Sequence, residues 1–220
     1  MAKKTKKGWL WLSLELIVVF IGVTAGFLFD NFREDQADRK LENKYLESFY
    51  NNLVADSVEI QNMIQNSQNN IDVSGRTVAS MQAGTLTNDS ALIVFSIMAT
   101  YNNLNLEDAT YESVVNSGNL GLIRDFKVRE KIVYYYGSHD DMRYVEEVYN
   151  DYITNYIVPF GSRNLDFISG EFIEEFSVND IEFRNITSGY YVLVTQKMNL
   201  VHTLDSLNSD LKNSLAALLN

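Results

Sequence analysis

One uninterrupted apolar segment near the N-terminus constrains this chain more than any other feature. Residues 9–29 read WLWLSLELIVVFIGVTAGFLF, and Glu15 is the only charged residue among them. At 1.5 Å per residue, a helix of about 21 residues spans the roughly 30 Å hydrocarbon core of a bilayer. Aromatic residues flank both ends, where membrane interfaces favour them: Trp9, Trp11, Phe27, Phe29 and Phe32. The segment therefore predicts a transmembrane helix over residues 9–29.

The charges that flank this segment predict its orientation. Four lysines precede it and three acidic residues follow it: Lys3, Lys4, Lys6, Lys7, then Asp30, Glu34 and Asp35. Lysine and arginine next to a membrane helix favour its cytoplasmic side. We therefore expect residues 1–8 to form a basic cytoplasmic tip and residues 30–220 to form one extracytoplasmic domain.

Two other interpretations of the apolar segment stay open. A cleaved signal peptide would also have a basic tip, and Thr24, Ala25 and Gly26 are small enough for a cleavage site. However, the apolar run exceeds the usual 7–15 residues, and the large Phe27 follows at once. A core helix of a soluble protein is the other alternative. We favour the membrane anchor over both.

The residues that interrupt the apolar pattern of the anchor share one face. At 100° per residue, Gly22 lies at about −20° and Gly26 at about +20° from Glu15. Two glycines four residues apart let another helix approach closely, and a carboxyl group within a membrane usually faces a partner or a hydrated cavity. We predict that Glu15, Gly22 and Gly26 contact another transmembrane helix. Two alternatives for Glu15 are that its side chain reaches interfacial water and that it belongs to an ion or proton path.

Composition limits what the remaining residues can do. The formal net charge is −11, and because residues 1–29 carry +3, residues 30–220 carry −14. Such a domain is repelled by nucleic acid and by anionic lipid headgroups. The chain has no cysteine, which excludes disulfides, zinc–thiolate sites and thiol nucleophiles. With one proline and 11 glycines, long helices are favoured, so we predict an all-α fold.

Helical periodicity continues beyond the anchor without a linker. Apolar residues recur at three-to-four spacing, with Asp56 as an interruption: Leu46, Phe49, Leu53, Ile60 and Met63. The anchor is therefore expected to continue into a stalk helix over residues 30–84 that ends at Gly84. Short helices are predicted after a cap at Thr87, Asn88 or Asp89, and over residues 107–117 before Gly118.

The last hundred residues predict two longer helices of a helical bundle. Asp125 caps the first, which has a stripe rich in tyrosine, is bent by Gly137 and Ser138, and ends at Pro159 and Gly161. We expect a short helix over residues 171–176. The final helix is expected to begin at a cap on Thr187 or Ser188. Its stripe consists of Leu200, Leu204, Leu207, Leu211, Leu215 and Leu218.

Two segments resemble an uncharacterised family of N-terminally membrane-anchored helical envelope proteins of Bacteroidota. The first is LELIVVFIGVTAGFLFDNFRED, which contains Glu15, and the second is TYESVVNSGNLGLIRDFKVREKIVYYY from Thr110 to Tyr136. Family members have a glutamate, an apolar run with glycine and an Asn-Trp pair, for which this chain has Asn31-Phe32. The resemblance implies a helical protein of the bacterial inner membrane with a periplasmic domain, and it implies no catalytic residue.

The sequence shows no pattern typical of a catalytic or metal site. The two histidines, His139 and His202, are too few for the phosphohydrolase chemistry that His139-Asp140-Asp141 suggests, and His139 lies in phase with an apolar stripe. Glu146 and Glu147 point about 100° apart on a helix, which suits solvation better than acid–base work. The tyrosine stripe fits a packed core better than a ligand pocket. We expect no enzyme activity, cofactor, metal or small-molecule ligand.

These features predict a non-enzymatic interaction protein anchored in the inner membrane lipid. Its expected partners are other transmembrane helices, either of a second copy or of a larger envelope complex in which it would be an accessory or scaffold subunit. The alternative is an extracytoplasmic ligand-binding sensor. Because only about eight residues precede the anchor, such a sensor would need a separate membrane partner to transmit its signal.

Overall fold

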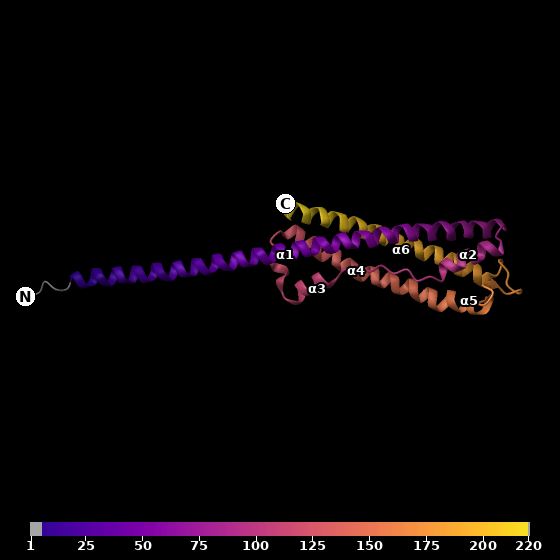
Figure 1. Ribbon diagram of the computed structural model, residues 1–220, viewed down its shortest axis with the longest axis horizontal. Coiled ribbons are helices and arrows are strands. Elements are labelled where there is room, and N and C mark those ends of the chain that lie inside the picture. The colour runs from indigo at the N-terminus through magenta and orange to yellow at the C-terminus, as the bar shows by residue number, and fades with distance from the viewer. Residues whose placement is uncertain (1–5, 220) are drawn as a thin grey trace, which may run out of the picture.

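The computed structural model describes residues 6–219, and nearly all of them are helical (Figure 1). Helices make up 83% of the chain. Within the described residues the only strands are β1 (Leu165–Asp166) and β2 (Glu171–Phe172), which pair antiparallel with Leu165 opposite Phe172. The predicted all-α class is confirmed apart from this small hairpin.

Helix α1 (Lys6–Ala83) joins the apolar segment and the predicted stalk in one continuous helix of 78 residues. It ends where the sequence predicts. Gly84 adopts a left-handed conformation with φ of +67°, which glycine tolerates best. The Thr85 N–H donates to the Ser80 carbonyl at 3.0 Å and the Gly84 N–H to the Met81 carbonyl at 3.3 Å, so both carbonyls of the last turn are satisfied.

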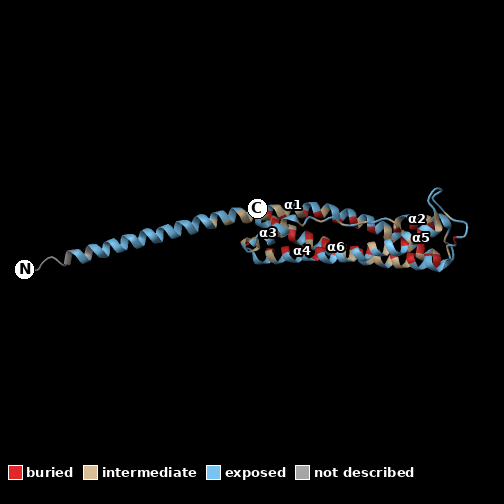
Figure 2. Ribbon diagram, turned by 90° about the horizontal axis from the view of Figure 1, so that it is seen from below, coloured by how far each residue is buried: buried red, intermediate tan, exposed pale blue. Residues whose placement is uncertain are grey.

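The two halves of α1 have different surroundings (Figure 2). Every side chain described from residue 8 to residue 34 is exposed, and Leu46 is the first buried one. The predicted stripe is buried from there on: Leu46, Phe49, Leu53, Ile60 and Met63. We call residues 46–219 the helical body. The anchor part of α1 projects from it, and the C-terminal end of the described residues lies close to where α1 enters it (Figure 1).

Three long helices form the helical body. Helix α6 (Ile181–Leu219) packs along α1 and along α4 (Phe126–Tyr152). The Asp125 side chain caps α4, as predicted, by accepting the Val128 N–H at 2.9 Å. Two apolar clusters fill the interior, one containing Phe49, Ile132 and Leu211 nearer the anchor, and one containing Phe95 and Phe183 at the far end. The anchor itself contributes to neither.

Short elements run back along the body between α1 and α4. They are α2 (Asn88–Met98), which the Thr87 side chain caps as predicted, α3 (Ala109–Asn116) and the 3-10 helix η1 (Asn119–Leu122). An extended stretch of residues 99–108, here called the connecting segment, links α2 to α3 (Figure 1). Gly118 ends α3 with φ of +72°, as expected. The connecting segment thus has little regular structure. Its backbone N–H and C=O groups therefore need side chains of other elements as hydrogen-bond partners.

The prediction that Pro159 and Gly161 end the second long helix is wrong. The chain continues through a π-helical turn, η2 (Ile153–Ile157), into α5 (Val158–Asn164). Pro159 lies in the first turn of α5, where its missing N–H does least harm. Gly161 has a packing role, because a Cβ atom there would lie 2.5 Å from Cζ of Phe95. Gly137 and Ser138, which were predicted to bend this helix, lie inside α4, which stays helical through both.

Two predictions for residues 165–190 are also wrong. Residues 171–176 form β2 and an irregular turn rather than a helix, because Gly170, at φ of +75°, reverses the chain into the hairpin. Helix α6 begins two turns before Thr187, because the Asp180 carboxylate caps it by accepting the N–H groups of Glu182 at 2.7 Å and Phe183 at 3.3 Å. The added turns bury Phe183 against the far apolar cluster.

The predicted apolar stripes are buried only in part. The stripe predicted for the second long helix is buried or half-buried over its first eight members: Val128, Ile132, Tyr135, His139, Met142, Val145, Tyr149 and Tyr152. Its last member, Tyr156, is 56% exposed, because the π turn adds a residue and rotates the following side chains. Ile157 and Phe160 take the buried positions instead. In the last turn of α6, Leu215 is buried and Leu218 is exposed.

Candidate functional site

The predicted contact face of the anchor lies in a regular part of α1. Glu15, Gly22 and Gly26 are all exposed, and the helix is uninterrupted around them, so the three residues share one side of it. A Cβ atom placed on either glycine has nothing within 4 Å. This face is therefore open in the single chain, and its role as a contact stays a prediction.

No part of the helical body covers the anchor. It belongs to the one helix, among the described residues, that is long and apolar enough to cross a membrane, and none of its most apolar window is buried. Trp9 is 80% exposed, Phe20 71% and Phe29 70%. Leaving so much contiguous apolar surface in water is unfavourable, at roughly 25 cal/mol for each Å². The anchor therefore needs an apolar environment that no other part of residues 6–219 supplies.

A buried polar network crosses the centre of the body around Asp56. The Asp56 carboxylate is fully buried and accepts the Tyr135 hydroxyl at 2.7 Å and the Glu107 N–H at 2.9 Å. The Asn208 amide donates to the Tyr135 hydroxyl at 3.2 Å and to the Leu53 carbonyl at 3.0 Å. Burial raises the pKa of Asp56 above its usual value near 3.8, against the opposing effect of these hydrogen bonds. The network joins α1, α4, α6 and the connecting segment.

A second buried network holds the connecting segment through Lys197 of α6. Its side chain is 1% exposed, and its ammonium group donates to the Asn102 carbonyl and lies 3.2 Å from the Glu146 carboxylate. Glu146 in turn accepts the Leu104 N–H at 2.6 Å. The ammonium also lies 4.9 Å from the centre of the Tyr149 ring, a favourable cation–π distance. Burial lowers the pKa of Lys197, and the nearby Glu146 opposes that shift.

His139 is a core residue, as its position in the apolar stripe predicts. It is 1% exposed, and its Nδ1 lies 2.5 Å from Oδ1 of Asp108. The other oxygen of Asp108 accepts from Arg143 at 2.8 Å. His202, on α6, is exposed. Within residues 6–219, no group of three or more His, Cys, Asp or Glu side chains could hold a metal ion.

The tyrosine-rich stripe of α4 is packed core, as predicted, rather than the wall of a pocket. Tyr135 and Tyr136 are 1% and 3% exposed, and Tyr136 stacks on Tyr111 with ring centres 4.7 Å apart. Burial raises the pKa of both phenols above 10, so both stay protonated at neutral pH.

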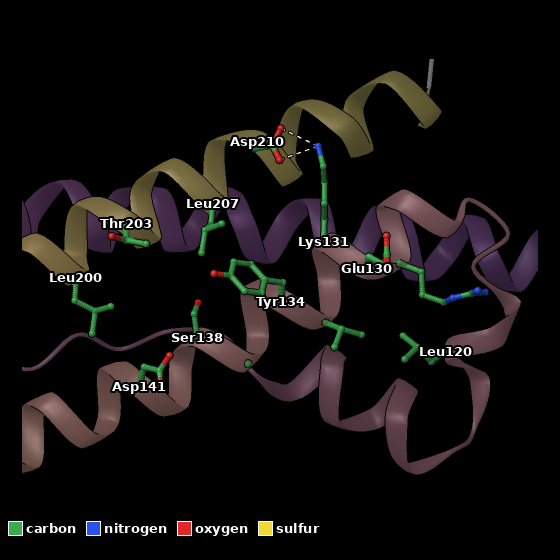
Figure 3. A pocket seen from close by; sticks show the side chains of 13 residues that line it. Leu120, Glu130, Lys131, Tyr134, Ser138, Asp141, Leu200, Thr203, Leu207 and Asp210 are labelled. Carbon is green, nitrogen blue, oxygen red and sulfur yellow. Dashed lines mark hydrogen bonds and ion pairs between the residues drawn. The ribbon is translucent and has the colours of Figure 1, made fainter.

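A groove between α4 and α6 is a feature that the sequence analysis missed (Figure 3). Its volume is about 770 Å³. In Figure 3, Leu207 of α6 faces Tyr134 of α4, and Lys131 reaches across to Asp210. Gly137 lines the same groove. The sequence contains one indication of this groove, Gly137, which lies in the interior of a helix. A glycine there predicts a bend in the helix as readily as a groove beside it.

Comparison with protein-family models, curated proteins and solved structures finds no match to this chain. The resemblance to the Bacteroidota envelope family therefore stays a prediction.

Proposed function

We propose that this chain is a non-enzymatic interaction protein, anchored in a bacterial inner membrane, whose anchor binds another transmembrane helix through Glu15, Gly22 and Gly26. Its N-terminus is cytoplasmic and its helical body, a bundle around α1, is periplasmic. The partner helix belongs to a second copy or to a membrane complex in which this chain is an accessory or scaffold subunit.

The observation that carries this proposal is the continuity of α1. One helix contains both the open anchor face and the buried stripe of the body, with no hinge between Phe29 and Leu46. From Phe29 to Ala83 it extends about 80 Å at 1.5 Å per residue. An association in the membrane would therefore fix the direction in which the body projects. A continuous helix of this kind suits a scaffold, because it would hold the helical body at a fixed distance and direction from the membrane partner without any catalytic group.

The alternative function, an extracytoplasmic ligand sensor, is favoured by one observation. The groove between α4 and α6, at about 770 Å³, lies in the range of roughly 300–1,000 Å³ typical of small-molecule sites. A ligand bridging these helices would contact two of the three long helices of the body. We rank this function second, because the residues that line the groove belong to η1, α4 and α6 and none belongs to α1, the helix that contains the anchor.

Gly22→Ile tests the proposed function. A branched side chain at this position keeps the partner backbone at a distance, and lipid cannot replace the lost packing, so we expect association to fall at least tenfold. The measurement is co-purification of the partner, or self-association of the full chain, in mild detergent. Phe20→Ile is the matched control, because Phe20 lies about 140° from Glu15 and its replacement leaves the face intact. Equal association of parent and Gly22→Ile would remove this face from the proposal.

A further inference from the structure

Gly137 occupies a position where neither backbone nor packing requires a glycine. It lies inside α4, where glycine is unfavourable relative to alanine, and a Cβ atom there has nothing within 4 Å. By contrast, Phe95 approaches Gly161 closely, and Gly84 has a positive φ. Gly137 lines the α4–α6 groove, so a side chain at position 137 would occupy part of that groove. The missing side chain therefore keeps the groove open.

The walls of the groove are lined by apolar side chains that are partly exposed to solvent. Tyr134 and Val133 of α4 are 66% and 42% exposed, although both line a concave surface. Leu200 and Leu207 of α6 are half-buried on the opposite wall (Figure 3). Covering these side chains with an apolar molecule removes their surface from water, which is favourable. The groove suits a ligand with an apolar body.

The length of the groove fits an extended ligand. Its α4 wall runs from Arg129 to Asp141, about 18 Å at 1.5 Å per residue. An extended alkyl chain can follow this wall from one end to the other.

A positively charged side chain, that of Arg129, lies at one end of the groove. Arg129 lines this end, where its guanidinium donates to the Ile123 carbonyl at 3.0 Å and has further N–H donors. Lys131 lies nearby but pairs with Asp210 at 2.7 Å, Glu130 also lines the groove, and the carboxylate of Asp141 lines its opposite end. A carboxylate is the group that a guanidinium binds best. This end therefore suits the head of a monocarboxylate.

We propose that the groove binds one long-chain fatty acid, with its alkyl chain over Gly137 and its carboxylate at Arg129. Hydrogen bonds from Ser57 to Asn208 and from Gln61 to Asp205 place this part of α6 beside residues 57–61 of α1. Along α1 that is about 40–50 Å from Phe29, and the other end of the groove, where Asn119 next to Leu120 donates to the Tyr45 hydroxyl at 2.8 Å, is about 24 Å from Phe29. If the anchor spans a membrane as proposed above, lipid chains in the bilayer do not reach the groove. The ligand is a free fatty acid rather than a bilayer lipid.

Photolabelling of the full chain in lipid nanodiscs tests this proposal. A palmitic acid with a mid-chain diazirine is added from solution, and in a second arm the same chain is part of the nanodisc phosphatidylcholine. Mass spectrometry then locates the adducts. We expect the free acid to label the groove walls of α4 and α6, and the phospholipid to label the anchor only. Unlabelled groove peptides in the first arm, or groove labelling by the phospholipid, would overturn the proposal.

Variants that fill the groove sharpen the test. Gly137→Leu should reduce groove labelling at least tenfold and raise the melting temperature, because it adds a helix-favouring side chain in open space. Thr203→Phe fills the groove from α6 at an exposed position and should also reduce labelling. Glu147→Leu, exposed on another side of α4, is the matched control and should label as the parent. Undiminished labelling of both filled variants would contradict the assignment. Failure of this test leaves the anchor face untouched, since neither variant alters it.

Discussion

Glu146→Ala should lower the free energy of unfolding by about 3–5 kcal/mol, the range observed when one partner of a buried ion pair is removed. Lys197 would be left at 1% exposure without the carboxylate that opposes the lowering of its pKa by burial, and the Leu104 N–H would lose its acceptor. The measurement is urea denaturation of the full chain in nanodiscs, followed by circular dichroism. Glu147→Ala, at the exposed neighbouring position, should change stability by less than about 0.5 kcal/mol.

A double variant separates charge from packing in this network. Glu146→Gln combined with Lys197→Met removes both charges and keeps an acceptor for the Leu104 N–H, so it should be much more stable than Glu146→Ala. If the double variant is as unstable as the single one, the loss comes from packing or from the Asn102 carbonyl that Lys197 no longer satisfies. Local hydrogen exchange in the connecting segment should rise in Glu146→Ala before it rises elsewhere.

The second large effect is expected at Asp56. Asp56→Ala leaves the Tyr135 hydroxyl and the Glu107 N–H without their acceptor, each at about 1–3 kcal/mol, so we expect a loss of about 2–6 kcal/mol. Asp56→Asn keeps an acceptor oxygen and should lose less. Denaturation in nanodiscs at neutral pH would give both values. A loss below about 1 kcal/mol for Asp56→Ala would mean that water replaces the carboxylate.

Asp56 also predicts a pH dependence with a definite sign. Burial raises its folded-state pKa above 3.8, so the folded protein binds this proton more readily than the unfolded chain. The parent therefore gains stability relative to Asp56→Asn as the pH falls from neutral through the folded pKa towards 3.8. The difference between the two proteins should widen over that range. If it narrows instead, hydrogen bonding outweighs burial and the pKa is lowered.

The sequence predicted most of the helices and their caps but not the buried carboxylates Asp56 and Glu146, for physical reasons. Apolar spacing and caps are local, so Thr87, Gly84 and Asp125 were assigned correctly. Asp56 was interpreted as an interruption of the stripe, yet it is fully buried. Its partners are far away in the sequence: Tyr135 follows 79 residues later. Periodicity alone contains no information about such distant pairing.

The errors around Glu146, Pro159 and Asp180 have a similar origin. The sequence analysis interpreted both Glu146 and Glu147 as solvated. Glu147 is exposed, but Glu146 is buried beside Lys197. Pro159 was taken as a helix end, although a π turn before it lets the chain remain helical. The Asp180 cap was missed because Thr187 fits the same local pattern. Tertiary packing decided each case.

The candidate contact face and the groove differ in how far the sequence could predict them, because only the residues of the contact face lie close together along the chain. Glu15, Gly22 and Gly26 follow from helical geometry, and the continuous α1 supports the spacing assumed for them. The groove required knowing that α4 and α6 are neighbours, which no short-range pattern contains. Gly137 becomes informative only once the open space beside it is known.

Site-specific photo-crosslinking within the anchor tests the central claim most directly. A photoreactive amino acid replaces Val19, about 40° from Glu15, or Phe20, about 140° away, in the full chain expressed in its membrane. Neither replacement enlarges a glycine, so the contact is probed without being disrupted. We expect a discrete crosslinked protein product from position 19 and only lipid adducts from position 20. Discrete products from position 20 alone, or from neither position, would contradict association through the face of Glu15, Gly22 and Gly26.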